Sequence, residues 1–345
     1  MPPPPMIQAL PEGGQTVVYS TVNDHEIKFD FWLPRTTGHL PAMIYYHGGG
    51  MSAGSRRGRG FPQWMYNHCQ EKGYIFISAD YRLCHPSNAM DQIDDAKNLF
   101  SYLSSSFHQN LPKSTTLDTA RIAVTGFSAG AYSARAACLY ATPKPAALLS
   151  VYGLGGNMLL DHWTRARPPT SLAKFVDLSA IPELLADHTV ISDDFGDGMS
   201  RRFALTVYWE IEGLFLDGVF QSPGLGKLLD AVPYEQRFGI TPQELKEGML
   251  QEFVKEDYPP SVFVHGLADE VVSPEESVFQ HEQLRGLGVD SKLFLIEGGP
   301  HGLEGAMKMM MMMGVPGTES GEKVIQDTME AYTEAMVFID GVFAK

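Results

Sequence analysis

Residues 122 to 130 read IAVTGFSAG and combine three local patterns. A short apolar run of β-type residues leads into a turn, and an alanine-rich, helix-type stretch follows Gly130. The turn has the pattern G-x-S-x-G with Ser128 at its centre, and its glycines leave room for a tight, strained backbone. The pattern predicts a turn that lifts the Ser128 hydroxyl above the end of a sheet, as a nucleophile requires. A glycine-rich turn with a helix-capping serine is the alternative interpretation.

Two later segments carry the partners that a serine nucleophile needs. A serine hydroxyl requires a neighbouring base, and the base requires an orienting carboxylate. Asp269 and His301 each come just after an apolar, strand-type run, where the carboxyl ends of parallel strands meet. The chain order serine, acid, histidine therefore predicts that Ser128, Asp269 and His301 form a catalytic triad. Glu270, beside Asp269, is the rival for the acid.

The sequence HGGG at residues 47–50 predicts the site of the oxyanion. Glycines after an apolar strand let backbone N–H groups approach a substrate oxygen without an intruding side chain. We predict an oxyanion hole made by the N–H groups of Gly49, Gly50 and Ala129. His47 is expected to shape this loop through hydrogen bonds and not to act as a base.

The apolar pattern of the whole chain predicts an α/β fold with a mostly parallel central sheet and helices on both faces. Strands that are apolar throughout, separated by helical segments, are typical of such a sheet. Two alternating segments near the start, joined at Asn23–Asp24, read as antiparallel strands that lead into it. The predicted strands are 15–22, 26–33, 42–46, 74–79, 122–124, 146–152, 261–264 and 291–296.

Between residues 153 and 257 the alternation of strands and helices stops. A stretch of about a hundred residues is too long for a simple loop in a compact domain. We therefore predict a mostly helical cap or lid inserted between two parts of the core, residues 1–152 and 258–345.

Local patterns predict further details of the later half of the chain. Thr241 and Pro242 stand where the N-cap and first residue of a helix over 241–252 would be. The methionine-rich run 307–313 is expected to be an apolar loop at the surface or in the core. Large aromatic side chains of the insertion are candidates either for its core or for a substrate pocket. They include Tyr208, Trp209, Phe215 and Phe220.

Five motifs in order carry a family resemblance. They are HGGG at 47–50, DYRL at 80–83, GFSAG at 126–130, GLADEVV at 266–272 and PHG at 300–302. Together they resemble the hormone-sensitive-lipase-like branch of the α/β-hydrolase superfamily. The resemblance implies the α/β-hydrolase fold and hydrolysis of a carboxylic ester without a cofactor. It also implies the triad and oxyanion hole named above, and it allows a homodimer, because members of this branch are often dimers.

The chain departs from the usual pattern of that branch at three places. Phe127 precedes the serine where an acidic or small residue is usual, Ala131 follows the motif in place of a glycine, and Cys84-His85-Pro86 replaces Ala-Pro-Glu. These departures bear on the substrate more than on the triad. Phe127 is predicted to shape one wall of the substrate pocket.

Composition excludes several other classes of function. A net charge of −15 disfavours nucleic acid and anionic membranes as partners. The three cysteines give no disulfide framework, and no two of them stand at metal-ligand spacing, which fits a reducing compartment and no bound metal. The stretch MPPPPMIQAL at residues 1–10 has no positive residue and no long apolar run, so no signal peptide is expected there. No apolar run is long enough to predict a membrane span. A cytoplasmic protein with a small-molecule acyl substrate is therefore expected.

The residues leave the reaction itself open. The same triad and oxyanion hole would serve an ester, a lactone, a thioester, an amide or the C–C bond of a 1,3-dicarbonyl, as in the biosynthesis of a small metabolite. A non-catalytic protein similar to gibberellin receptors belongs to another class. Such receptors have lost the triad histidine, whereas His301 is present here.

Overall fold

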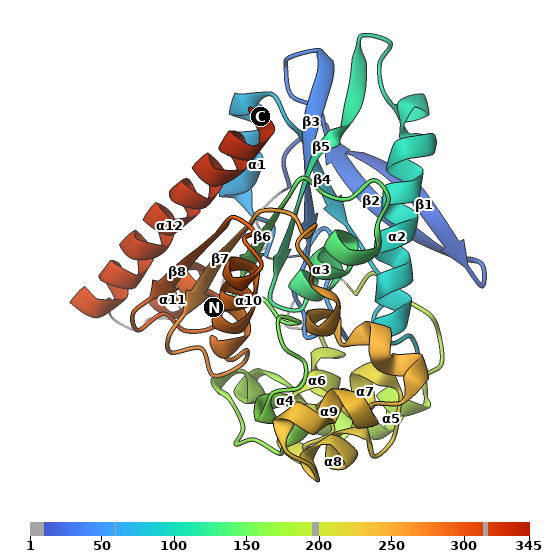
Figure 1. The fold of residues 1–345 in the computed structure, drawn as a ribbon, viewed down its shortest axis with the longest axis vertical. Helices are drawn as coiled ribbons and strands as arrows, with labels where there is room; N and C mark the ends of the chain where they lie inside the picture. The colour runs from blue at the N-terminus through green and yellow to red at the C-terminus, as the bar shows by residue number, and fades with distance from the viewer. Residues whose placement is uncertain (1–9, 59, 195–199, 313–316) are drawn as a thin grey trace, which may run out of the picture.

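The computed structural model describes residues 10–58, 60–194, 200–312 and 317–345, and its strands form one twisted eight-stranded sheet (Figure 1). The strands are β1 (Gln15–Val22), β2 (His25–Trp32), β3 (Gly38–Tyr46), β4 (Ile75–Ala79), β5 (Thr115–Phe127), β6 (Ala147–Val151), β7 (Ser261–Gly266) and β8 (Ser291–Ile296). Their order is β1-β2-β4-β3-β5-β6-β7-β8, and only the pairs β1–β2 and β2–β4 are antiparallel. The prediction of a mostly parallel sheet with an antiparallel edge is confirmed.

Helices cover both faces of the sheet because successive strand side chains point to opposite sides. In β3, Ile44 and Tyr46 belong to one apolar core, whereas Met43 and Tyr45 belong to the other. The first core contains residues of α2 (Ala89–Ser105), α3 (Gly130–Tyr140), α10 (Glu275–Gly286) and the short η1 (Phe107–Asn110). The second contains residues of α1 (Gln63–Lys72), α11 (Leu303–Met312) and α12 (Glu319–Phe343).

The segment from 152 to 260, which joins β6 to β7, is mostly helical where it is described. Figure 1 shows its helices grouped together beyond one end of the sheet. They are α4 (Asp161–Thr164), α5 (Ile181–Ala186), α6 (Phe203–Glu212), α7 (Phe215–Phe220), α8 (Leu225–Asp230) and α9 (Tyr234–Ile240). Short 3₁₀ turns connect them, namely η2 (Ser171–Phe175), η3 (Leu178–Ala180), η4 (Gln243–Gly248) and η5 (Leu250–Phe253). We refer to residues 152–260 as the insertion.

The sheet gathers the loops that carry the motifs. In the parallel pair β3–β5, Tyr46 lies opposite Gly126, so the HGGG loop and the serine turn leave the sheet side by side. The chain after β7 and β8 leaves at the same carboxyl edge, because both strands run parallel to β6. This edge is where sites of open α/β sheets assemble.

Two local predictions are wrong. The helix predicted over 241–252 is instead the pair of 3₁₀ turns η4 and η5, and the Thr241 hydroxyl donates to the carbonyl of Arg237 at the end of α9. The methionine-rich run is not a loop from Met307 to Met312, because these residues continue α11. Methionine is a strong helix former, and that preference decides the conformation. Met313 and the side chains of Met309, Met311 and Met312 lie outside the described part of the structure.

Candidate active site

Ser128 stands on the strained turn that the G-x-S-x-G pattern predicts. Its φ is +52°, in the left-handed region that a serine rarely adopts. A Cβ on Gly126 would lie 2.3 Å from the Cα of Ala131, and one on Gly130 would lie 2.2 Å from the carbonyl oxygen of Tyr46. Both contacts are with backbone that cannot move aside, so each glycine is required by the closeness of strand, turn and helix.

Ser128, His301 and Asp269 lie in one hydrogen-bonded chain. The Nδ1 of His301 is 2.7 Å from Oδ2 of Asp269, and its Nε2 is 3.0 Å from the Ser128 hydroxyl oxygen. Because a carboxylate only accepts, Nδ1 carries the proton and Nε2 is free to accept from the Ser128 hydroxyl. This is the arrangement in which a histidine can act as a general base toward a serine.

The acid is held from several sides. Oδ1 of Asp269 accepts the backbone N–H groups of Val271 and Val272 at 2.9 and 3.0 Å. Its Oδ2 also lies 3.2 Å from Nε2 of the fully buried His265. Burial alone would raise the pKa of Asp269, but His301 and the hydrogen bonds from both histidines hold that pKa well below its usual range.

The rival Glu270 turns to another partner, since its Oε1 accepts the backbone N–H of Ser171 in the insertion. His265 is bound to Ser277 as well as to the acid.

The HGGG loop presents unpaired backbone donors beside the serine. Gly49 and Gly50 both have positive φ, at 128° and 61°. Among the residues that the structure describes, the N–H groups of Gly49, Gly50 and Ala129 donate no hydrogen bond. A Cβ on Gly48 would lie 3.2 Å from the Cβ of Ser128, so the loop and the serine turn are in close contact.

The direction of these donors follows from peptide planarity, because a fixed carbonyl aims the N–H of the next residue the opposite way. The Nδ1–H of His47 donates to the carbonyl of Gly48 at 2.8 Å, which orients the N–H of Gly49. The carbonyl of Gly49 accepts from the N–H groups of Ser52 and Ala53, at 3.2 and 3.0 Å, which orients the N–H of Gly50. His47 thus shapes the loop as predicted.

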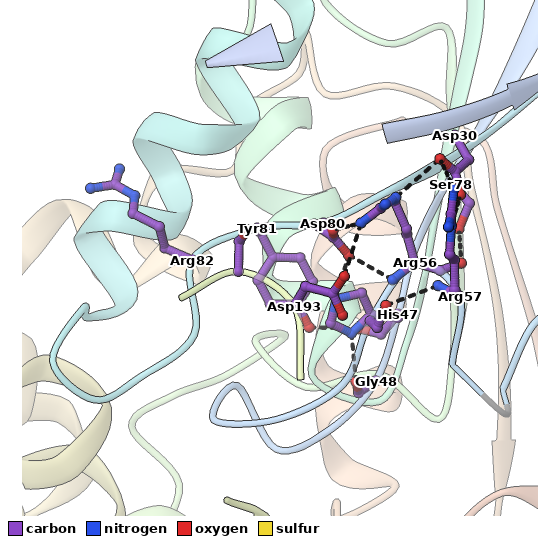
Figure 2. Close-up of polar contacts among 12 residues, drawn as sticks. Asp30, His47, Gly48, Arg56, Arg57, Ser78, Asp80, Tyr81, Arg82 and Asp193 are labelled. Atoms are coloured by element: carbon purple, nitrogen blue, oxygen red, sulfur yellow. Dashed lines mark hydrogen bonds and ion pairs between the residues drawn. The ribbon is translucent and has the colours of Figure 1, made fainter. Parts of the chain in front are cut away.

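Figure 2 shows the buried polar network that supports His47. The His47 ring stacks on Tyr81 with 4.4 Å between the ring centres, and the Tyr81 hydroxyl donates to the His47 carbonyl. Arg56 pairs with Asp80 and with Asp30. Burial raises the pKa of Asp80 to about 7 against the opposing charge of Arg56, and burial lowers the pKa of His47 to about 4. The network thus links the HGGG loop to residues of the DYRL motif.

An aromatic cavity of about 190 Å³ adjoins Ser128. Its walls include the rings of Tyr45, Phe127 and Tyr152. The Tyr152 ring also lies edge-on to His301, with 5.0 Å between the ring centres. Phe127 therefore lines a cavity next to the serine. Tyr152 was missed by the sequence reasoning, although its position directly after β6, at the carboxyl edge of the sheet, is a signal that could have found it.

The other predicted pocket residues do not line this cavity. Phe215 is buried inside the insertion, where it stacks on Trp163 with 4.4 Å between the ring centres. Trp209 packs against α7 so closely that a Cβ on Gly218 would lie 2.2 Å from its ring. The half-buried Tyr208 is likewise absent from the cavity wall, and the buried Phe220 packs in the same core. Trp209, Phe215 and Phe220 are buried in an apolar core, which is the usual place for large aromatic residues, and do not face the serine.

A group of charged residues from the insertion meets the acid loop. Nη1 of Arg167 donates to the carbonyls of Glu270 and Val271, and His162 donates to the carbonyl of Val271 at 2.9 Å. Nη2 of Arg167 pairs with the buried Glu210 at 3.0 Å. Burial raises the pKa of Glu210 to about 7 despite this pairing. No pattern in the sequence marks these contacts, because they join residues far apart in the chain.

The described residues contain no group of three or more His, Cys, Asp or Glu side chains arranged to hold a metal ion. None of the helices in the described ranges has both the length and the apolar character that a bilayer crossing requires.

Comparison with known proteins points in two directions. The family model BD-FAE matches residues 29–181. A non-reducing polyketide synthase of Stereocaulon alpinum is 23% identical in an alignment 342 positions long, which covers 91% of this chain and 13% of the synthase. A carboxylesterase of Mycobacterium tuberculosis is 32% identical over 130 residues, 37% of this chain and 38% of the esterase. The chain thus spans only 8–14% of the length of the four polyketide synthases that it matches.

Solved structures agree on the fold. A protein of unknown function from Staphylococcus aureus aligns over 93% of this chain and 99% of its own, with a TM-score of 0.58 and 18% identity. An esterase of Thermogutta terrifontis with bound propionate aligns over 96% of both chains, with a TM-score of 0.53 and 19% identity.

Proposed function

We propose that this chain, which shares its fold with solved esterases, is a serine esterase that cleaves a carboxylic ester through an acyl-enzyme on Ser128. The observation that carries this proposal is the hydrogen-bonded chain of Ser128, His301 and Asp269. Ester hydrolysis needs a base at the serine hydroxyl and hydrogen-bond donors at the carbonyl oxygen of the ester. The triad supplies the base, and the unpaired N–H groups beside the serine turn supply the donors.

The proposed reaction uses each of these groups in turn. The Ser128 oxygen attacks the ester carbonyl while His301 takes the hydroxyl proton at Nε2, and Asp269 stabilises the resulting imidazolium through Nδ1–H. The carbonyl oxygen becomes an oxyanion that the N–H groups of Gly49, Gly50 and Ala129 bind. The bond to the alcohol then breaks, and His301 passes its proton to the leaving oxygen. Water, deprotonated by His301, attacks the acyl-enzyme and releases the acid and free Ser128.

The surroundings of the serine suggest a small hydrophobic substrate. The cavity of about 190 Å³ has three aromatic rings in its wall, and such rings favour apolar or aromatic groups. We propose that the insertion acts as a cap that limits the size of what enters. The proposed chemistry needs only water and the side chains and backbone N–H groups of the protein.

A thioester is the second candidate substrate. One observation favours it. An alignment with a polyketide synthase covers 91% of this chain but only 13% of the synthase, so one segment of that synthase has about the size of this chain. The same triad could release an acyl chain from a thioester, with a thiol in place of the alcohol as leaving group. Oxygen esters and thioesters of one shared acyl group, compared by kcat/KM, distinguish the two candidates.

A fluorophosphonate probe tests the proposal as a whole. The probe should label the wild-type protein and leave Ser128→Ala unlabelled, because only an activated serine displaces fluoride. Hydrolysis of a nitrophenyl ester should disappear in the same variant. Ser133→Ala is the matched control, since Ser133 is a fully buried serine of α3 and should not affect labelling. Labelling that persists in Ser128→Ala would refute the assignment.

A further inference from the structure

Helix α6 of the insertion presents a buried polar row to the catalytic core. Arg202, at the start of the helix, and Thr206 and Glu210 within it are spaced four residues apart, so they lie on one face. All three are at most 6% exposed. Arg202 donates to the carbonyls of Ser52 and of Cys84 and His85, and Glu210 pairs with Arg167 beside the acid loop. The middle residue, Thr206, meets the HGGG loop.

The contact between Thr206 and the HGGG loop is close and specific. The Thr206 hydroxyl donates to the carbonyl of Gly50 at 2.8 Å and lies 2.7 Å from the hydroxyl of Ser52. A Cβ on Gly50 would lie 2.3 Å from the Thr206 Oγ1, so the helix occupies the space that any larger residue would need. Since Gly50 is buried, its carbonyl would have no water to replace this bond.

The hydrogen bond from Thr206 fixes the Gly50 carbonyl, which none of the hydrogen bonds described within the HGGG loop holds. Hydrogen bonds within the loop hold the carbonyls of Gly48 and Gly49, and thereby the N–H groups of Gly49 and Gly50. The next peptide, from Gly50 to Met51, is held at its carbonyl by Thr206. Glycine at a φ of +61° has many alternative conformations, so a free carbonyl here would let Gly50 rotate.

We propose that Thr206 is a positioning residue of the oxyanion hole, which the insertion thereby completes. This inference rests on the proposed esterase function and names a residue outside every motif of the chain. Thr206 touches neither the serine nor the reacting carbonyl. It acts by holding the Gly50–Met51 peptide, which fixes the backbone torsions of Gly50 and keeps this donor residue from shifting. Arg202 anchors the helix that carries Thr206.

The test compares Thr206→Val, which removes the hydroxyl but keeps the shape, with Thr206→Ser, which keeps the hydroxyl. On a nitrophenyl ester we expect Thr206→Val to lower kcat by about 10-fold to 100-fold with little change in KM, because a misplaced donor weakens transition-state binding. Thr206→Ser should restore most of kcat. A trifluoromethyl ketone, which adds to Ser128 and places an oxyanion in the hole, should bind Thr206→Val more weakly by a similar factor.

Thr328→Val is the control for loss of a buried threonine hydroxyl, since the Thr328 hydroxyl donates to the Val324 carbonyl within α12. It should match Thr206→Val in stability loss but keep the wild-type kcat. A folded Thr206→Val with unchanged kcat and ketone affinity would overturn the inference alone. Failure of Ser128-dependent hydrolysis in the wild type would instead refute the proposed function, and this inference with it.

Discussion

Replacement of Asp269 by asparagine should disable the enzyme while leaving its shape intact, and the structure says which way the new amide will turn. Oδ1 faces the N–H groups of Val271 and Val272, which can only donate. The amide oxygen must therefore take the Oδ1 position, since the opposite orientation would set an NH₂ against two N–H donors. The NH₂ group then faces Nδ1 of His301 at the 2.7 Å contact.

The consequence is a histidine in the wrong tautomer. Nδ1 of His301 has to accept from the amide, so the ring proton moves to Nε2 and points at the Ser128 hydroxyl. His301 can no longer take the serine proton. A wrong tautomer of this kind lowers kcat by about 10⁴-fold, which corresponds to about 5 kcal/mol of transition-state stabilisation.

The assay is the steady-state hydrolysis of a nitrophenyl ester by Asp269→Asn, with circular dichroism to show that the variant is folded. Glu270→Gln is the matched control one residue away. Its partner is the N–H of Ser171, which a glutamine oxygen can also accept, so kcat should stay within about twofold of wild type. A folded Asp269→Asn that keeps a tenth of the wild-type kcat, or a Glu270→Gln that is equally damaged, would refute the reasoning.

Two further predictions concern residues at the contact between the insertion and the core. Gly50→Ala should abolish hydrolysis and lower the melting temperature, because its Cβ would collide with Thr206. The control Gly288→Ala has a similar φ of +75° but no neighbour within 4 Å, so it should lose only about 1–2 kcal/mol of stability and keep its activity. Equal effects of the two substitutions would contradict this reasoning. Burial raises the pKa of Glu210 from 4.5 to about 7, so the native state holds an extra proton between these values and its stability falls as the pH rises through them. Between these pH values the free energy of unfolding should fall more in the wild type than in Glu210→Gln, by a difference on the order of 3 kcal/mol. Urea denaturation at pH 5 and pH 8 measures the difference, and parallel pH profiles would exclude it.

The fold was predictable because its signals are local. Each parallel strand of the core contains a short apolar run, and each motif follows such a run, so topology alone brings Ser128, Asp269 and His301 to one edge. The extent of a strand was less predictable: β5 begins at Thr115, well before the apolar residues at 122–124, because its first half is polar and still pairs with β3.

The insertion shows where local signals end. The bond from Thr206 to Gly50 joins residues 156 positions apart, and nothing in either neighbourhood requires the other. At Thr241 the sequence has the form of a helix start, but the hydroxyl finds the Arg237 carbonyl of the preceding helix first. The aromatic side chains of α6 and α7 carry no mark that tells a pocket wall from a core, and Trp209 and Phe215 became core.

The hydrogen bond between α6 and the HGGG loop bears on how such a protein can be re-engineered. Grafting a foreign cap between positions 152 and 260 looks like a simple way to offer new substrates to an old triad. The graft would also remove Thr206 and Arg202, whose side chains bond to the residues after β3. A chimaera should therefore keep the native α6, together with α7, whose Val219 carbonyl accepts from Cys84, and vary the helices α8 and α9. We expect functional relatives to differ in sequence elsewhere in the insertion while keeping the contacts of α6.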